Sequence, residues 1–109
     1  MSHEVFQDVA FPFDEDQFPH NLCAVVQTTV LNAAEPARVV IHDGDNDWLV
    51  GDGVNDPTLP GASVVACIRH IADQDETVAE LASLPIGHIA ERDDVGSPWR
   101  IGVHKYPDE

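Results

Sequence analysis

Short apolar runs rich in β-branched residues recur along this chain, with clusters of turn-forming residues between them. β-branched side chains fit the pleated surface of a sheet, and runs this short are typical of strands. The turn at 43–47, with the sequence Asp-Gly-Asp-Asn-Asp, predicts a hairpin, and a later turn that contains Gly96 predicts another. The predicted strands are 22–31, 38–42, 48–50, 64–68, 87–92 and 99–104.

A helical period replaces the strand pattern between residues 71 and 84, where apolar side chains recur at the spacing of one helix face. Asp75 is a candidate N-cap for this helix, and Pro85 and Gly87 are expected to end it. We therefore predict an α+β fold: a mostly antiparallel sheet of about five strands with one main helix, near residues 75–84, packed on one face.

The length of 109 residues predicts one domain. We expect residues 22–105 to form a single α+β domain, an acidic aromatic N-terminal arm to occupy 1–21, and the tail at 106–109 to be frayed. The arm holds all four phenylalanines of the chain. Because such side chains are costly to leave in water, part of the arm is expected to pack on the domain.

The chain carries a formal net charge of −15, from 20 acidic and 5 basic residues. This charge repels nucleic-acid phosphates and anionic lipid surfaces, so it argues against nucleic acid and membrane as partners and favours a basic protein partner. A GC-rich genome or adaptation to salt would also produce an acidic chain, and both explanations stay open. The expected assembly is a monomer or a homodimer.

The N-terminus lacks the basic flank and apolar stretch of an export signal, and no run approaches the ~20 apolar residues of a membrane span. The expected location is therefore the cytoplasm.

Cys23 and Cys67 each lie inside an apolar run, and we interpret them as two buried thiols.

Asp43, Asp45 and Asp47 occupy alternate positions in the first predicted turn, a pattern that invites comparison with calcium-binding loops. An EF-hand loop needs glycine at its sixth position and glutamate at its twelfth, where this chain has Trp48 and Val54. A hairpin turn rich in carboxylates is the favoured interpretation. Weak binding of a divalent cation stays open, because flexible oxygen ligands suit hard cations.

His42 ends the strand before this turn and is an added candidate ligand for such a cation. The histidines, serines, cysteines and glycine-rich segments match no metal, catalytic or cofactor motif. We therefore expect a protein that is not an enzyme and needs no cofactor.

Trp48 and Trp99 each begin a predicted strand. Core packing is their expected role, whereas an exposed pair would be an interface anchor.

Several short blocks follow one another in order over residues 14–104. They are 18–21 (Phe-Pro-His-Asn), 29–31 (Thr-Val-Leu), 42–43 (His-Asp), 47–48 (Asp-Trp), 71–75 (Ile-Ala-Asp-Gln-Asp), 81–87 (Leu-Ala-Ser-Leu-Pro-Ile-Gly), 91–92 (Glu-Arg) and 98–99 (Pro-Trp). The series resembles a family of small, uncharacterised bacterial domains. That family is similar to a broader set of domains of unknown function, some of which are immunity proteins beside bacterial polymorphic toxins.

The resemblance implies structural roles for the recurring residues and no established activity. It implies that Asp75 caps a helix, that Pro85 and Gly87 stop it, and that Trp48 and Trp99 pack.

The chain departs from the family pattern at 49–51 and at His88, where aromatic residues are usual. The function expected from charge and resemblance is a non-catalytic protein-binding module, immunity or antitoxin-like. The alternative is a small-molecule or divalent-cation-binding domain that uses the turn at 43–47.

Overall fold

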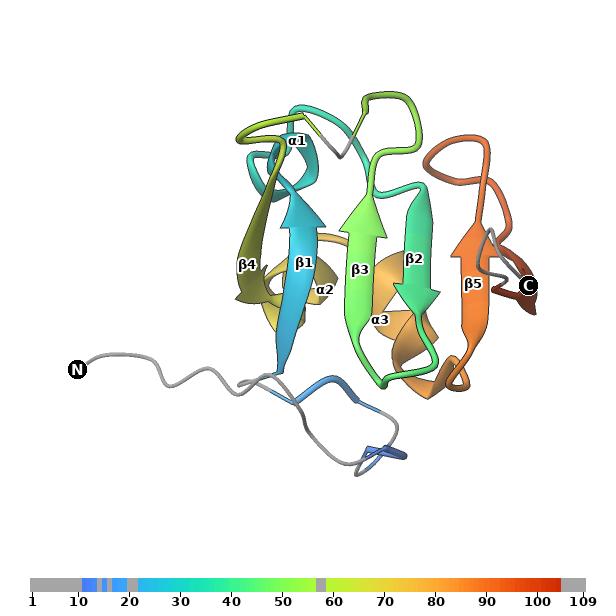
Figure 1. Cartoon of the computed structure of the whole chain (residues 1–109). Coiled ribbons are helices and arrows are strands. Elements are labelled where there is room, and N and C mark those ends of the chain that lie inside the picture. Colours follow the sequence, from blue (N-terminus) through green and yellow to red (C-terminus); the bar gives the residue numbers. More distant parts are fainter. Residues whose placement is uncertain (1–10, 14, 16, 20–21, 57–58, 105–109) are drawn as a thin grey trace.

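The computed structural model describes residues 11–13, 15, 17–19, 22–56 and 59–104, which form one six-stranded sheet with short helices (Figure 1). The tail at 106–109 and the rest of the N-terminal arm lie outside the described residues. The α+β class is confirmed. The strands are β1 (Cys23–Gln27), β2 (Val39–His42), β3 (Trp48–Gly51), β4 (Ser63–Cys67), β5 (His88–Glu91) and β6 (Arg100–Val103).

The sheet is mixed and has six strands, which corrects the prediction of a mostly antiparallel sheet of about five strands. Its order is β4-β1-β3-β2-β5-β6. β1 and β3 pair in parallel, with Val25 opposite Leu49, and the other neighbours pair antiparallel. The parallel pair arises because β2 is not a direct neighbour of β1. After the β2–β3 turn, β3 runs antiparallel to β2 and fills the position between β1 and β2, where it pairs in parallel with β1. The two predicted hairpins, β2–β3 and β5–β6, are confirmed.

The first strand is shorter than predicted. β1 ends at Gln27, and the next residues form one helical turn, α1 (Thr28–Leu31). The turn buries Val30 and brings the Thr29 hydroxyl within 2.6 Å of the Asp52 carboxylate, to which it donates a hydrogen bond. These tertiary contacts override the strand preference of a β-branched run.

The predicted single main helix is instead three short ones: α2 (Ile68–Gln74), α3 (Glu76–Ala79) and the 3-10 helix η2 (Glu80–Ser83). Asp75 separates α2 from α3 because its backbone is extended, with φ −141° and ψ 104°. Its carboxylate accepts a hydrogen bond from the Thr77 N–H at 2.9 Å, so the predicted N-cap is confirmed. Every helix among the described residues is too short or too polar to cross a lipid bilayer.

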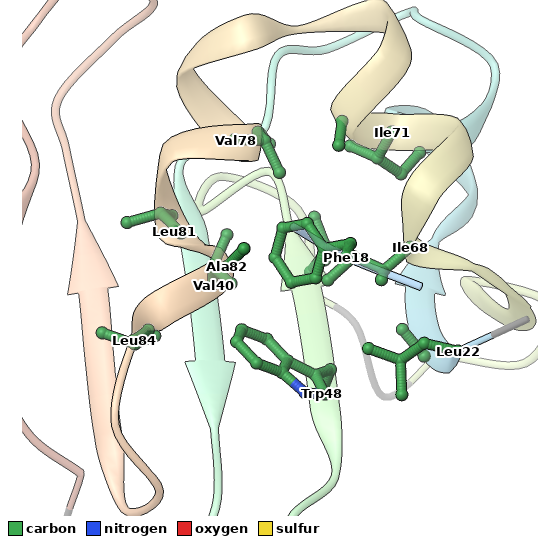
Figure 2. Close-up of a cluster of buried hydrophobic side chains, with 14 of the residues drawn as sticks. Phe18, Leu22, Val40, Trp48, Ile68, Ile71, Val78, Leu81, Ala82 and Leu84 are labelled. Atoms are coloured by element: carbon green, nitrogen blue, oxygen red, sulfur yellow. The ribbon is translucent and has the colours of Figure 1, made fainter. Parts of the chain in front are cut away.

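The hydrophobic core lies between these helices and one face of the sheet (Figure 2). Trp48 is 1% exposed, and Phe18 packs edge-on against it with ring centroids 5.0 Å apart. Phe13 is also buried in this cluster, and Phe11 packs against it. Part of the N-terminal arm therefore packs on the domain, as expected from its phenylalanines.

Gly87 has the predicted positive φ, at +82°, but it does not stop the helix: the helical segment ends at Ser83 with Leu84 as its C-cap, and Gly87 lies in the turn before β5. A Cβ at this position would meet nothing within 4 Å, so the constraint is the backbone conformation. We expect Gly87→Val to lower the free energy of unfolding by at least about 1 kcal/mol, because a β-branched residue is strained there. Urea denaturation would measure the loss.

Gly102→Val is the matched control, because Gly102 has equal space around it and no positive φ. An equal loss of stability in both variants would contradict the assignment of the effect at Gly87 to its left-handed backbone.

Candidate functional site

The face of the sheet opposite the helices carries a strip of apolar side chains. Val25 on β1, Leu49 on β3 and Ile41 on β2 are register neighbours across it. Val26 and Val50 point into the core instead, because side chains alternate along a strand. Figure 1 views the sheet from this side, with α2 and α3 behind the strands. Val25 is 42% exposed, so the strip is open to a ligand.

A groove of about 450 Å³, here called the sheet groove, runs over this strip. Its lining residues are Val25, Gln27, Val39, Ile41, Leu49, Val50, Gly51, Gly53, Asn55 and Ser63. The floor is made of aliphatic side chains, and none of these lining residues is charged. A groove with this lining suits the apolar part of a ligand rather than a charged metabolite.

Asp52 fixes the loop that forms one wall of the sheet groove. Its side chain is fully buried, and its carboxylate accepts hydrogen bonds from the Val54 N–H at 2.9 Å and the Asn55 N–H at 2.8 Å. The Asn55 side-chain amide and the Thr29 hydroxyl also donate to it, at 2.7 and 2.6 Å. Burial raises the pKa of this carboxyl, but the bonds from Asn55, Thr29 and Val54 outweigh burial and hold the pKa well below its usual range.

Gln27 ties the same loop to β1. Its amide nitrogen donates to the Asn55 carbonyl at 3.1 Å, and its amide oxygen accepts the Asp52 N–H at 2.8 Å. The groove wall is therefore held by buried polar contacts before any ligand arrives. Sequence reasoning missed Gln27 and Asp52. The local signal was Asp52 itself, because an Asp side chain in a loop often accepts the N–H two residues on, here that of Val54, to form an Asx turn.

The sheet groove continues into a smaller hollow of about 170 Å³, which shares Val25 and Leu49 with it. Asp43, Asp47 and Cys23 also line this hollow, here called the acidic end. The candidate site is thus an apolar groove with carboxylates at one end. Such a surface can hold an aliphatic side chain and a cationic group of the same ligand.

The turn at 43–47 is a structured hairpin turn, as the favoured interpretation predicts. One oxygen of Asp43 accepts hydrogen bonds from the N–H groups of Asp45, at 2.9 Å, and Asp47, at 3.0 Å. Carboxylate oxygens of all three aspartates lie within 4.8 Å of one another. The alternating pattern in the sequence therefore brings these carboxylates together, but the Asp43 carboxylate also holds the turn.

His42 is engaged on both of its ring nitrogens. Nδ1 lies 2.6 Å from the Leu84 carbonyl, and Nε2 lies 2.6 Å from the Asn46 side-chain oxygen. The imidazole is fully buried and stacks on Trp48, with ring centroids 4.0 Å apart. While these contacts hold, His42 has no lone pair for a cation at the turn, so the structure gives no support to its place among the candidate ligands.

The two tryptophans have different surroundings. Trp48 is buried in the core and offers no surface to a partner, which agrees with the expected packing role. Trp99 is half-buried; its Nε1 donates to the Thr77 carbonyl at 3.0 Å, and the Arg92 guanidinium lies 4.1 Å from its ring centroid. Only Trp99 keeps exposed surface, so the interface role stays a prediction for that residue alone.

Cys67 is buried, as predicted, whereas Cys23 is half-buried and lines the acidic end. The structure places the two residues opposite each other on β1 and β4. Sequence reasoning treated them as separate thiols.

Comparison of the chain with protein-family models, with curated proteins and with solved structures finds no match in any of the three.

Proposed function

We propose that this chain is a non-catalytic protein-binding module, immunity or antitoxin-like, that acts in the cytoplasm on a basic protein partner. The observation that carries the proposal is the sheet groove with its acidic end. An aliphatic side chain of the partner lies over Val25 and Leu49, and a neighbouring lysine or arginine reaches Asp43 and Asp47.

The charge of the chain supports this proposal independently of the groove. A net charge of −15 sets up a field that attracts a basic surface from beyond contact distance. Such a field mainly raises the association rate, whereas apolar burial in the groove sets the dissociation rate. The two surface features therefore predict two separable kinetic effects. The resemblance to immunity-associated domains is a second, weaker support.

The experiment measures association and dissociation rates against the basic product of an adjacent gene, on an immobilised surface, from low to near-molar salt. We expect the association rate to fall by at least about tenfold over this range, because exposed charges are screened beyond roughly 10 Å at 0.1 M salt. An association rate that stays constant from low to near-molar salt would contradict the proposal for that partner, and the acidity of the chain would then have no role in binding.

A matched pair of variants tests the groove. Val25→Ser removes aliphatic surface from the groove floor, whereas Val103→Ser makes the same change at an exposed site on β6, outside the groove lining. We expect Val25→Ser to speed dissociation by about tenfold, which is the effect of losing roughly 1.4 kcal/mol at an interface. Equal dissociation rates for the two variants would exclude the groove as the contact surface.

A second candidate function is binding of a divalent cation or a small molecule at the turn at 43–47. The spacing of the Asp43, Asp45 and Asp47 carboxylates, within 4.8 Å of one another, favours it. A rise in the melting temperature on addition of calcium, without any protein partner, would support this candidate, because a ligand that binds only the folded state stabilises it.

A further inference from the structure

The antiparallel pairing of β1 and β4 places Cys23 directly opposite Cys67. An antiparallel ladder alternates between hydrogen-bonded pairs and non-hydrogen-bonded pairs, in which the facing residues are closer, about 4.5 Å between Cα atoms. Which kind of pair the cysteines form therefore decides whether their sulfur atoms can meet.

The backbone hydrogen bonds at the two ends of this ladder settle the question. The Ile68 N–H donates to the Leu22 carbonyl at 3.2 Å, and the Thr28 N–H donates to the Ala62 carbonyl at 2.7 Å. Both bonds join residues directly opposite each other in the same register, so hydrogen-bonded pairs fall at even positions of β1. Cys23 opposite Cys67 is consequently a non-hydrogen-bonded pair.

Such a pair meets the requirements of a disulfide. Disulfides join cysteines whose Cα atoms lie roughly 4.4–6.8 Å apart, with the Cβ atoms on the same side, and directly opposed residues of a ladder share one face of the sheet. The two thiols also lie close enough to affect each other: burial raises the pKa of the Cys23 thiol, and the nearby Cys67 and Asp47 raise it further. Because the thiolate is the nucleophile, this raised pKa slows the exchange near neutral pH, and a mildly alkaline pH favours it. Burial also raises the pKa of the Cys67 thiol.

We propose that Cys23 and Cys67 form a reversible cross-strand disulfide by exchange with a low-molecular-weight disulfide such as oxidised glutathione. Cys23 attacks first, because it lines the acidic end whereas Cys67 is buried.

The exchange takes two steps. The Cys23 thiolate attacks one sulfur of the reagent, forms a mixed disulfide and releases one glutathione thiolate. The Cys67 thiolate then attacks the Cys23 sulfur, forms the intramolecular bond and releases the second glutathione. The protein loses two electrons and two protons, and one oxidised glutathione becomes two reduced molecules.

The test equilibrates the full chain with mixtures of oxidised and reduced glutathione at pH 8. Intact mass measured after alkylation of the remaining thiols should convert from a doubly alkylated to an unalkylated species, with no glutathione attached. Peptide mapping should find Cys23 linked to Cys67 within one chain. The melting temperature should rise by at least about 5 °C on oxidation, because the bond closes a long loop of the unfolded chain.

Two variants test the order of attack and the geometry. Cys67→Ser should accumulate the mixed disulfide at Cys23, because the second thiol is missing. The double variant Cys67→Ser, Val65→Cys keeps two thiols on the same strands but moves one to the diagonal position, roughly 7–8 Å away, where an internal disulfide should not form.

The proposal would be overturned if both thiols of the wild-type chain persist across the whole glutathione series. It would also be overturned if oxidation yields only disulfide-linked dimers on a non-reducing gel, or if the diagonal variant closes its bond as readily as the wild type. None of these outcomes depends on the identity of a protein partner, so the disulfide and the proposed function fail separately.

Discussion

Arg92→Met should lower the free energy of unfolding by about 3 kcal/mol, because removing one member of a buried ion pair leaves the other without its counter-charge. The Arg92 side chain is completely buried, and NH2 of its guanidinium lies 2.9 Å from the Asp75 carboxylate. The same guanidinium donates to the Ala37 carbonyl at 2.9 Å and to the Thr77 hydroxyl at 2.6 Å, and it packs over Trp99. One side chain thus joins β5 to the start of α3 and to the segment before β6.

Methionine keeps most of the length and apolar stem of the arginine, so the loss reports on the guanidinium. Arg100→Met is the matched control: Arg100 lies 3.2 Å from Asp93, but their side chains are 60% and 82% exposed. Exposed pairs of this kind contribute roughly 0–1 kcal/mol. Urea denaturation of both variants measures the difference, and similar losses would show that the buried contacts of Arg92 add nothing beyond an ordinary surface pair.

Asp52→Asn should lower the free energy of unfolding by about 2 kcal/mol, because hydrogen bonds to a buried charged group are stronger than neutral ones. The new amide nitrogen would also oppose a donor, since the Asp52 carboxylate now accepts from the amide of Asn55 and from the hydroxyl of Thr29. Asp45→Asn, at an exposed position of the turn, is the control and should change stability by less than about 0.5 kcal/mol.

The loss in free energy of unfolding caused by Asp52→Asn should also depend on pH, in a defined direction. The pKa of Asp52 in the folded chain lies below the value of about 3.9 in an unfolded chain, so its stabilising effect is complete above that pH. The effect is lost as the pH falls from there through the folded pKa. The gap in stability between wild type and variant should therefore be widest at pH 7 and narrow below about pH 4. A gap of constant size would indicate that Asp52 does not act through its charge.

The parts of the fold that depend on neighbours in the sequence were predictable. The turns at 43–47 and around Gly96 carry their own signals, and so do the N-cap at Asp75 and the positive φ at Gly87. The sheet order was not predictable, because nothing local to β1 specifies that β3 and β4 become its neighbours. The single helix was wrong because the Asp75 side chain bonds to both Thr77 and Arg92, which holds an extended residue inside a helical pattern.

The same distinction applies to the candidate site. The three turn aspartates were visible because they are close in the sequence. The sheet groove was hidden, because its floor combines Val25, Leu49 and Ile41 from three strands whose register follows from the mixed topology. The sequence also could not show that Cys23 faces Cys67, because this pairing depends on β1 and β4 being neighbours in the sheet.

The position of β1 between β4 and β3 has a consequence for how the chain folds. β1 is the first strand in the sequence, but its parallel partner β3 and its antiparallel partner β4 both follow later. The hairpins β2–β3 and β5–β6 can close from local contacts, whereas β1 must wait for distant ones, and pairings between distant segments slow folding. A growing chain cannot pair both edges of β1 until Cys67 has been added, so we expect the docking of β1, rather than the formation of either hairpin, to limit the folding rate.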